Sequence, residues 1–213
     1  MRTTIIFLVT MVGLGTAMAN QDLPPNDFAQ TFAGLSAMLD QETLSPMDMA
    51  EGTYLAARYF SVGQPGLPYT QSRFKHAKTK GEASMAGLYM TIHGKTNEIA
   101  AMRRELETAP GKRAWLRELV GSEQNFNFAM EQGEQWAPLV RVLPSTVGAK
   151  AFSGTCMQSP DVLVRRAGLY WGYWIASPEY VKAARKCAAS DPDPTTRKLA
   201  GLVLAKMKQN SEE

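Results

Sequence analysis

The chain has 213 residues and a formal net charge of +3, from 23 lysine and arginine residues against 20 aspartate and glutamate residues. Without Arg2, which belongs to the leader described below, the balance is 22 against 20. That excess is far below what nucleic-acid binding requires, so we expect no nucleic acid as a partner. The length is sufficient for one domain or for two closely packed helical parts.

The first 19 residues predict a secretory signal peptide. Arg2 supplies a positive start, an apolar run follows from Ile5 to Leu14, and the small residues Ala17 and Ala19 fit a cleavage site after Ala19. The apolar run is too short to span a bilayer, and no later stretch reaches that length. We therefore expect a chain that starts at Asn20, has no transmembrane anchor and is periplasmic or secreted.

Residues 20–144 predict a helical N-terminal region without a regular repeat. The first helix follows a cap at Asn26-Asp27, and the second begins at Ser45-Pro46. A long helix is predicted from about Ala83 to Glu107, weakened locally by its glycines. The residues expected on the inner faces of the first two helices are Phe28, Phe32, Leu35 and Leu39, and then Met47, Ala50, Tyr54 and Ala57.

Residues 145–213 contain a motif that occurs twice. It runs from Cys156 to Arg165 and again from Cys187 to Arg197, so that cysteine recurs after 31 residues and arginine after 32. Such a period indicates one supersecondary unit used twice. With turns at Ser159-Pro160 and Ser177-Pro178, the pattern predicts two helical hairpins in tandem.

The junctions inside these hairpins resemble a known repeat. The segment Asp191-Pro-Asp193-Pro-Thr-Thr-Arg197 is similar to the inter-helix segment of short bacterial HEAT repeats, and Ser159-Pro-Asp161-Val-Leu-Val-Arg165 is similar but has serine in place of the leading aspartate. The resemblance covers the last third of the chain. It implies an all-α fold whose C-terminal hairpins stack as a short HEAT-like α-solenoid beside an irregular helical N-terminal part.

The junction residues have a physical role of their own. Asp161 and Asp193 are expected to cap the second helix of each hairpin, because a carboxylate satisfies the free N–H groups at a helix start. Arg165 and Arg197, one turn further on, can reach a carboxylate of the neighbouring repeat and so link the units. Anion binding by these arginines is the alternative.

Cys156 and Cys187 lie at equivalent positions of neighbouring units. Because an exported chain matures in an oxidising compartment, the spacing favours a disulfide between them. Buried free thiols remain an alternative, and so does a redox pair, although the CxxC spacing of thioredoxin-like sites is absent.

The aromatic run Tyr170-Trp171-Gly-Tyr173-Trp174 is the candidate binding surface. On a helix these four rings cover more than one face, so some of them are expected to be exposed and able to stack on a sugar or to anchor a partner protein. Burial between neighbouring helices is the alternative.

No residue pattern predicts catalysis, a metal site or a cofactor. The chain has only two histidines, His76 and His93, without a zinc-binding spacing, and no Gly-x-Ser-x-Gly elbow. Two alternatives remain open. Pairs of glutamates could act as acid and base in a periplasmic glycan hydrolase, and methionine thioethers could bind Cu(I). The residues concerned are Glu105, Glu107, Glu131 and Glu134 for the hydrolase, and Met38, Met47 and Met49 for copper.

The expected function is therefore binding. A short helical solenoid offers a rigid curved surface that recognises another macromolecule without chemistry. The sequence predicts an exported scaffold or inhibitor whose partner is another protein of the cell envelope or another exported protein.

Overall fold

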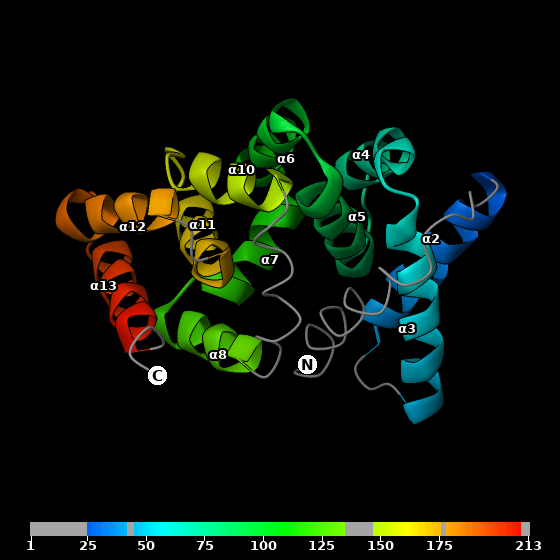
Figure 1. Cartoon of the computed structure of the whole chain (residues 1–213), viewed down its shortest axis with the longest axis horizontal. Helices are drawn as coiled ribbons and strands as arrows, with labels where there is room; N and C mark the ends of the chain where they lie inside the picture. Colours follow the sequence, from blue (N-terminus) through cyan, green and yellow to red (C-terminus); the bar gives the residue numbers. More distant parts are fainter. Residues whose placement is uncertain (1–24, 42–44, 135–146, 176–177, 210–213) are drawn as a thin grey trace. The chain divides into compact units, whose positions relative to one another are not determined.

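The computed structural model describes residues 25–41, 45–134, 147–175 and 178–209. Over these residues the protein consists of eleven α-helices and one 3₁₀-helix, without a strand (Figure 1). The predicted all-α class is confirmed. The signal peptide predicted for residues 1–19 lies outside the described residues.

Helices long and apolar enough to cross a membrane do not occur in the described part of the chain.

The chain forms two compact units, one ending at Gly94 and the other beginning at Lys95. The sequence predicts that the repeats begin at residue 145 and that residues 20–144 form a separate region. In the structure, the helices between Lys95 and Glu134 belong to the same unit as the C-terminal hairpins.

The first unit contains four α-helices and the 3₁₀-helix. Its elements are α2 (Pro25–Leu39), α3 (Pro46–Ser61), η2 (Gln64–Gly66), α4 (Leu67–Lys75) and α5 (Lys80–His93). Helix α2 packs against α3 and α5, and α4 packs against α5. The core between them is largely aromatic: Phe28 stacks on Tyr59 with ring centroids 4.7 Å apart, and Tyr89 lies edge-on to Phe28 at 5.7 Å.

The inner face predicted for α3 is wrong at Met47 and Tyr54, whereas Ala57 is half-buried and the side chain of Ala50 lies outside the described residues. Met47 and Tyr54 are 79 % and 55 % exposed, whereas Ala56, Tyr59 and Phe60 are buried. The four predicted positions keep a helical spacing, but the larger rings at positions 59 and 60 turn the other side of the helix toward the aromatic core.

The long helix predicted for residues 83–107 is divided into α5 and α6 (Thr96–Thr108). Gly94 has extended backbone angles and its N–H still bonds to the carbonyl of Met90 at 2.7 Å, which ends α5. The Glu98 carboxylate then accepts the N–H of Lys95 at 3.0 Å, which stabilises the start of α6. Glycine is a weak helix former, and this new cap completes the break.

The second unit contains three helical hairpins and one additional helix in its described part. The hairpins are α6 with α7 (Pro110–Val120), α10 (Val147–Cys156) with α11 (Val162–Ile175), and α12 (Pro178–Ser190) with α13 (Pro194–Gln209). The additional helix, α8 (Glu123–Glu134), packs against α7 and α13. The turn predicted at Ser159-Pro160 lies between α10 and α11.

The three hairpins pack in chain order. The first helices are in contact with one another, α6 with α10 and α10 with α12, and so are the second helices, α7 with α11 and α11 with α13. We refer to α6, α7 and α10 to α13 as the hairpin array; its last hairpin is drawn in orange and red in Figure 1. The turns between the two helices of the second and third hairpins contain Asp161 and Asp193.

Candidate functional site

Three arginines occupy the same place in the hairpin array, one in the first turn of each second helix. They are Arg113 in α7, Arg165 in α11 and Arg197 in α13. Each backbone N–H bonds to the carbonyl four residues earlier, and each Nη1 donates to the carbonyl six residues earlier, at 3.0 Å for Glu107 O, 3.0 Å for Ser159 O and 2.5 Å for Asp191 O. The shared pattern makes the three junctions structurally equivalent.

The aspartates of the second and third junctions cap the helices that follow. The Asp161 carboxylate accepts the N–H groups of Leu163 at 2.9 Å and Val164 at 3.3 Å. The Asp193 carboxylate accepts the N–H and the hydroxyl of Thr196 at 2.7 and 2.6 Å. These bonds satisfy donors that a helix start otherwise leaves free.

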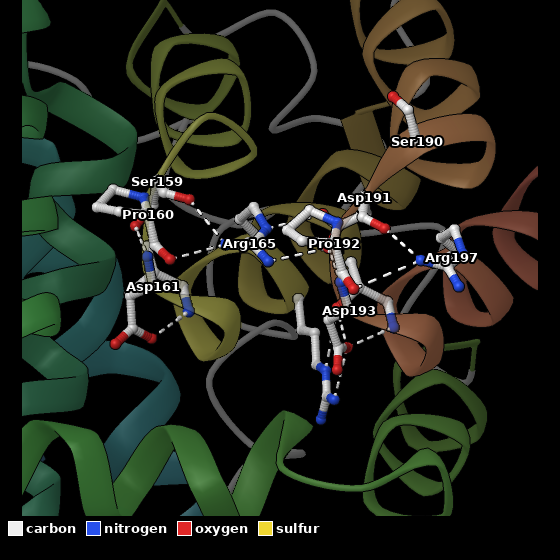
Figure 2. A network of polar contacts seen from close by, with 12 residues as sticks. Ser159, Pro160, Asp161, Arg165, Ser190, Asp191, Pro192, Asp193 and Arg197 are labelled. Carbon is white, nitrogen blue, oxygen red and sulfur yellow. Dashed lines mark hydrogen bonds and ion pairs between the residues drawn. The ribbon is translucent and has the colours of Figure 1, made fainter.

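Arg165 connects two hairpins through opposite edges of one guanidinium group, as Figure 2 shows. Its Nη1 donates to the Ser159 carbonyl of its own junction, while Nε and Nη2 donate to the two oxygens of Asp191 at 2.7 and 2.9 Å. Both side chains are buried. A bidentate pair of this kind fixes orientation as well as distance, so α11 is held in a defined position against the last junction.

The first junction reaches the second by a different route. Arg113 pairs with Asp161, because position 159, which corresponds to Asp191, holds a serine. The hydroxyl of Ser159 donates to Glu107 Oε1 at 2.5 Å. The replacement of aspartate by serine thus moves the ionic contact by two residues and adds a hydroxyl contact in its place.

A second arginine of α11 joins three elements. Arg166 donates to the carbonyls of Val120 and Gly121 at 3.2 and 2.7 Å, where α7 ends, and to the Asp193 carboxylate at 2.9 Å. It is buried, and its Nε also lies 3.3 Å from the Thr196 hydroxyl. Arg166 therefore satisfies the free carbonyls of α7 and the cap of α13 together.

The Asp193 carboxylate is held in its charged form. Burial alone would raise its pKa, but the hydrogen bonds from Thr196 and Arg166 outweigh burial and lower the pKa to about 2. This carboxylate therefore stays ionised well into the acidic range.

Arg197 ends the series of arginines. Its Nη1 bonds to the carbonyls of Asp191 at 2.5 Å and Pro192 at 3.5 Å. No carboxylate pairs with it within the described ranges, whereas Arg113 and Arg165 each have one.

The contacts of Arg113, Arg166 and Asp191 were not predicted from the sequence. A signal for Arg113 was present: proline stands three residues before it, as Pro194 does before Arg197. The unequal spacing hid it, since 52 residues separate Arg113 from Arg165 and only 32 separate Arg165 from Arg197.

The rings of the candidate binding surface point in more than one direction. Tyr170 and Tyr173 are buried, which corresponds to the alternative of burial between helices. Trp171 is half-buried and packs edge-on against Phe152, with ring centroids 6.0 Å apart. The side chain of Trp174 lies outside the described part of the structure.

Cys156 and Cys187 are buried free thiols in the structure, and the predicted disulfide between them is not seen. Burial raises the pKa of both thiols. A raised pKa lowers the thiolate fraction, so both are poorly reactive toward oxidants and alkylating agents in the folded protein.

The glutamates weighed for acid–base chemistry have ionic partners where their contacts are described. Glu105 lies 3.4 Å from Lys112, and Glu107 lies 3.3 Å from Arg103. Glu131 is exposed, and the side chain of Glu134 is outside the described residues. No cluster of three or more His, Cys, Asp or Glu side chains able to hold a metal occurs among the residues that were searched, which are the described ones.

Comparisons with protein-family models, with curated proteins and with solved structures find no match.

Proposed function

We propose that the protein is exported, as a periplasmic or secreted chain, and acts as a non-catalytic module that binds another protein of the cell envelope or another exported protein. In this proposal residues 1–19 are the signal peptide, and the chain that remains serves as a scaffold or an inhibitor. The hairpin array is the observation that carries the proposal, because it combines a repeated architecture with buried ionic links between its units.

The hairpin array is, in this proposal, a short HEAT-like α-solenoid. Two findings support that assignment: the arginine pattern recurs at three junctions, and first helices contact first helices while second helices contact second helices. In repeat arrays each unit contacts only its neighbours, which leaves an extended outer surface for a partner.

Binding is favoured over chemistry at the junctions because the buried polar groups there already have structural partners. Arg165 makes hydrogen bonds to Ser159, Pro160 and Asp191, and Arg166 bonds to two carbonyls and a carboxylate. Groups engaged in this way orient helices. The exposed side chains of the array are the ones available to another molecule.

Affinity capture tests the proposal. A tagged chain starting at Asn20 is incubated with envelope extract of its own organism, and the proteins retained are identified by mass spectrometry. We expect a specific protein to be retained at stoichiometric level and to be lost when the bait carries Arg165→Ala, which removes a link of the array. The matched control is Arg58→Ala, a substitution in the first unit.

Two further measurements test the proposed export and the choice between protein binding and glycan hydrolysis. N-terminal sequencing of the protein recovered from the envelope fraction is expected to begin at Asn20. Release of soluble fragments from purified peptidoglycan, with no protein retained by the bait, would contradict the binding function and support a glycan hydrolase instead.

A further inference from the structure

Arg197 repeats the geometry of Arg165 except for one contact. In both arginines Nη1 is held by the carbonyls five and six residues earlier. In Arg165 the other edge of the guanidinium group, Nε and Nη2, donates hydrogen bonds to the two oxygens of Asp191. In Arg197, within the described ranges, this edge has no carboxylate, although the group is oriented by its own junction in the same way.

The last hairpin is also strongly basic. From Pro178 to Gln209 it carries seven lysine and arginine residues and three acidic residues, Glu179, Asp191 and Asp193. The two aspartates pair with arginines of α11, at 2.7 Å for Asp191 with Arg165 and 2.9 Å for Asp193 with Arg166. The exposed basic side chains on the outer side of α12 are Lys182, Arg185 and Lys186.

We propose that Arg197 and the outer side of α12 dock an acidic partner protein. One carboxylate of that partner binds Nε and Nη2 of Arg197, as the Asp191 carboxylate binds Nε and Nη2 of Arg165. This inference rests on the proposed binding function and names the surface and the chemistry of its partner. The guanidinium group is preoriented by the carbonyls of Asp191 and Pro192, so little side-chain freedom remains to be lost when a carboxylate binds.

A second copy of this chain does not supply that carboxylate from its own first junction. The position that corresponds to Asp191 is Glu107, which is already engaged by Arg103 and Ser159, at 3.3 and 2.5 Å. The position that corresponds to Asp161 is Ala109, which has no carboxylate. We therefore take the occupant to be a different protein, whose exposed acidic segment complements the basic charge of the last hairpin.

The test uses the full chain from Asn20 and a zero-length cross-linker. Arg197→Lys keeps the positive charge and introduces an amine, which a water-soluble carbodiimide joins only to a carboxylate in direct contact. The captured complex is treated with the carbodiimide, and the linked peptides are sequenced. We expect an amide bond between position 197 and an aspartate or glutamate of the partner, and no such bond from Arg58→Lys, the matched control in the first unit.

Arg197→Gln supplies the binding readout. We expect the partner to be recovered about tenfold less than with the parent chain, the effect of one charge-assisted bidentate contact, while Arg58→Gln recovers it normally. Thermal unfolding of Arg197→Gln is measured alongside, so that a loss of binding is separated from a loss of fold; if the variant melts early, the cross-link from Arg197→Lys decides.

The outcomes separate this inference from the proposed function. If the parent chain captures no protein, the binding function itself fails. If it captures a protein but position 197 forms no amide bond and Arg197→Gln binds normally, only the docking surface at Arg197 is overturned. Retention of anionic lipid vesicles through position 197, in place of a protein, would also overturn it.

Discussion

Arg165 is the residue whose loss we expect to harm the fold most. Its guanidinium holds its own junction and the next one, and both it and Asp191 are buried. Arg165→Ala would leave the Asp191 carboxylate buried without its cation. We expect the free energy of unfolding to fall by about 3 to 5 kcal/mol, measured by urea denaturation of the chain from Asn20.

The exposed Arg185 provides the control for this substitution. Arg185→Ala, in the same hairpin array, is expected to change the free energy of unfolding by less than about 0.5 kcal/mol. Equal stability of the two variants would show that the bond between Arg165 and Asp191 contributes nothing to the array.

Asp193 is expected to give the array an acid-sensitive component. Its pKa is lowered to about 2 in the folded protein, below the value of about 3.9 for an unfolded chain. A lowered folded pKa stabilises the protein above the unfolded value, and this stabilisation is lost as the pH falls toward the folded value. It amounts to about 2.6 kcal/mol as an upper estimate, at 1.36 kcal/mol per pKa unit.

Comparison with Asp193→Asn isolates this contribution. We expect the variant to be less stable than the parent at pH 6, and the difference in the free energy of unfolding to shrink between pH 4 and pH 2. Urea unfolding at several pH values measures it. A difference that stays constant over this range would mean that the Asp193 charge is not coupled to folding.

At the level of single residues, the sequence predicted the types of contact better than the partners. The cap positions Asp161 and Asp193 and the reach of Arg165 to a neighbouring carboxylate could be predicted from spacing, and the structure places these groups in contact accordingly. Which carboxylate each arginine uses could not be predicted. Ser159 in place of aspartate redirects Arg113 to Asp161, and that depends on distances that only the packed hairpins define.

At the level of helices, two glycines of the array have opposite expected responses to alanine. A Cβ atom on Gly172 of α11 would lie 1.8 Å from Cε2 of Tyr180, a buried ring whose hydroxyl bonds to the carbonyl of Leu169 at 2.9 Å. Gly201 of α13 has open space around the same position. We expect Gly172→Ala to destabilise by about 1 to 3 kcal/mol and Gly201→Ala to stabilise by about 0.5 to 1 kcal/mol.

The pair is measured as the shift in urea midpoint of the chain from Asn20. Because both substitutions add one methyl group within a helix of the array, helix propensity alone would move both midpoints upward. A rise for Gly172→Ala would therefore contradict the close contact between α11 and the ring of Tyr180.

Helix existence could be predicted more reliably than helix faces. The starts of α11 and α13 follow from proline and aspartate in the turns before them, which are local signals. The inner face of α3 was predicted incorrectly because Met47 and Tyr54 have the same spacing as a core stripe, and only the aromatic core of the first unit shows that Tyr59 and Phe60 are inside. The break at Gly94 depends on the cap from Glu98, which periodicity does not reveal.

At the level of the whole molecule, the second unit is expected to fold without the first. The residues from Lys95 onward have a core of their own, with Ile99, Leu116, Phe126 and Leu169 almost completely buried. A fragment of residues 95–213 is expected to give a helical circular dichroism spectrum and a cooperative urea transition. Arg165→Ala should lower the stability of this fragment as much as it lowers that of the longer chain, and a fragment without a transition would contradict the division after Gly94.

The arginine links of the hairpin array give it a polarity. Arg113 and Arg165 both reach from their own hairpin toward the one that follows in the chain. Among the described contacts, the link that runs the other way is the hydrogen bond from the Ser159 hydroxyl to Glu107, which involves no cation. Each hairpin therefore offers a cation to its successor and a carboxylate to its predecessor. An added hairpin that carries the same junction would fit after α13, where the cation is open, but not before α6, where Glu107 is already engaged. The array could thus be lengthened by duplication at one end only.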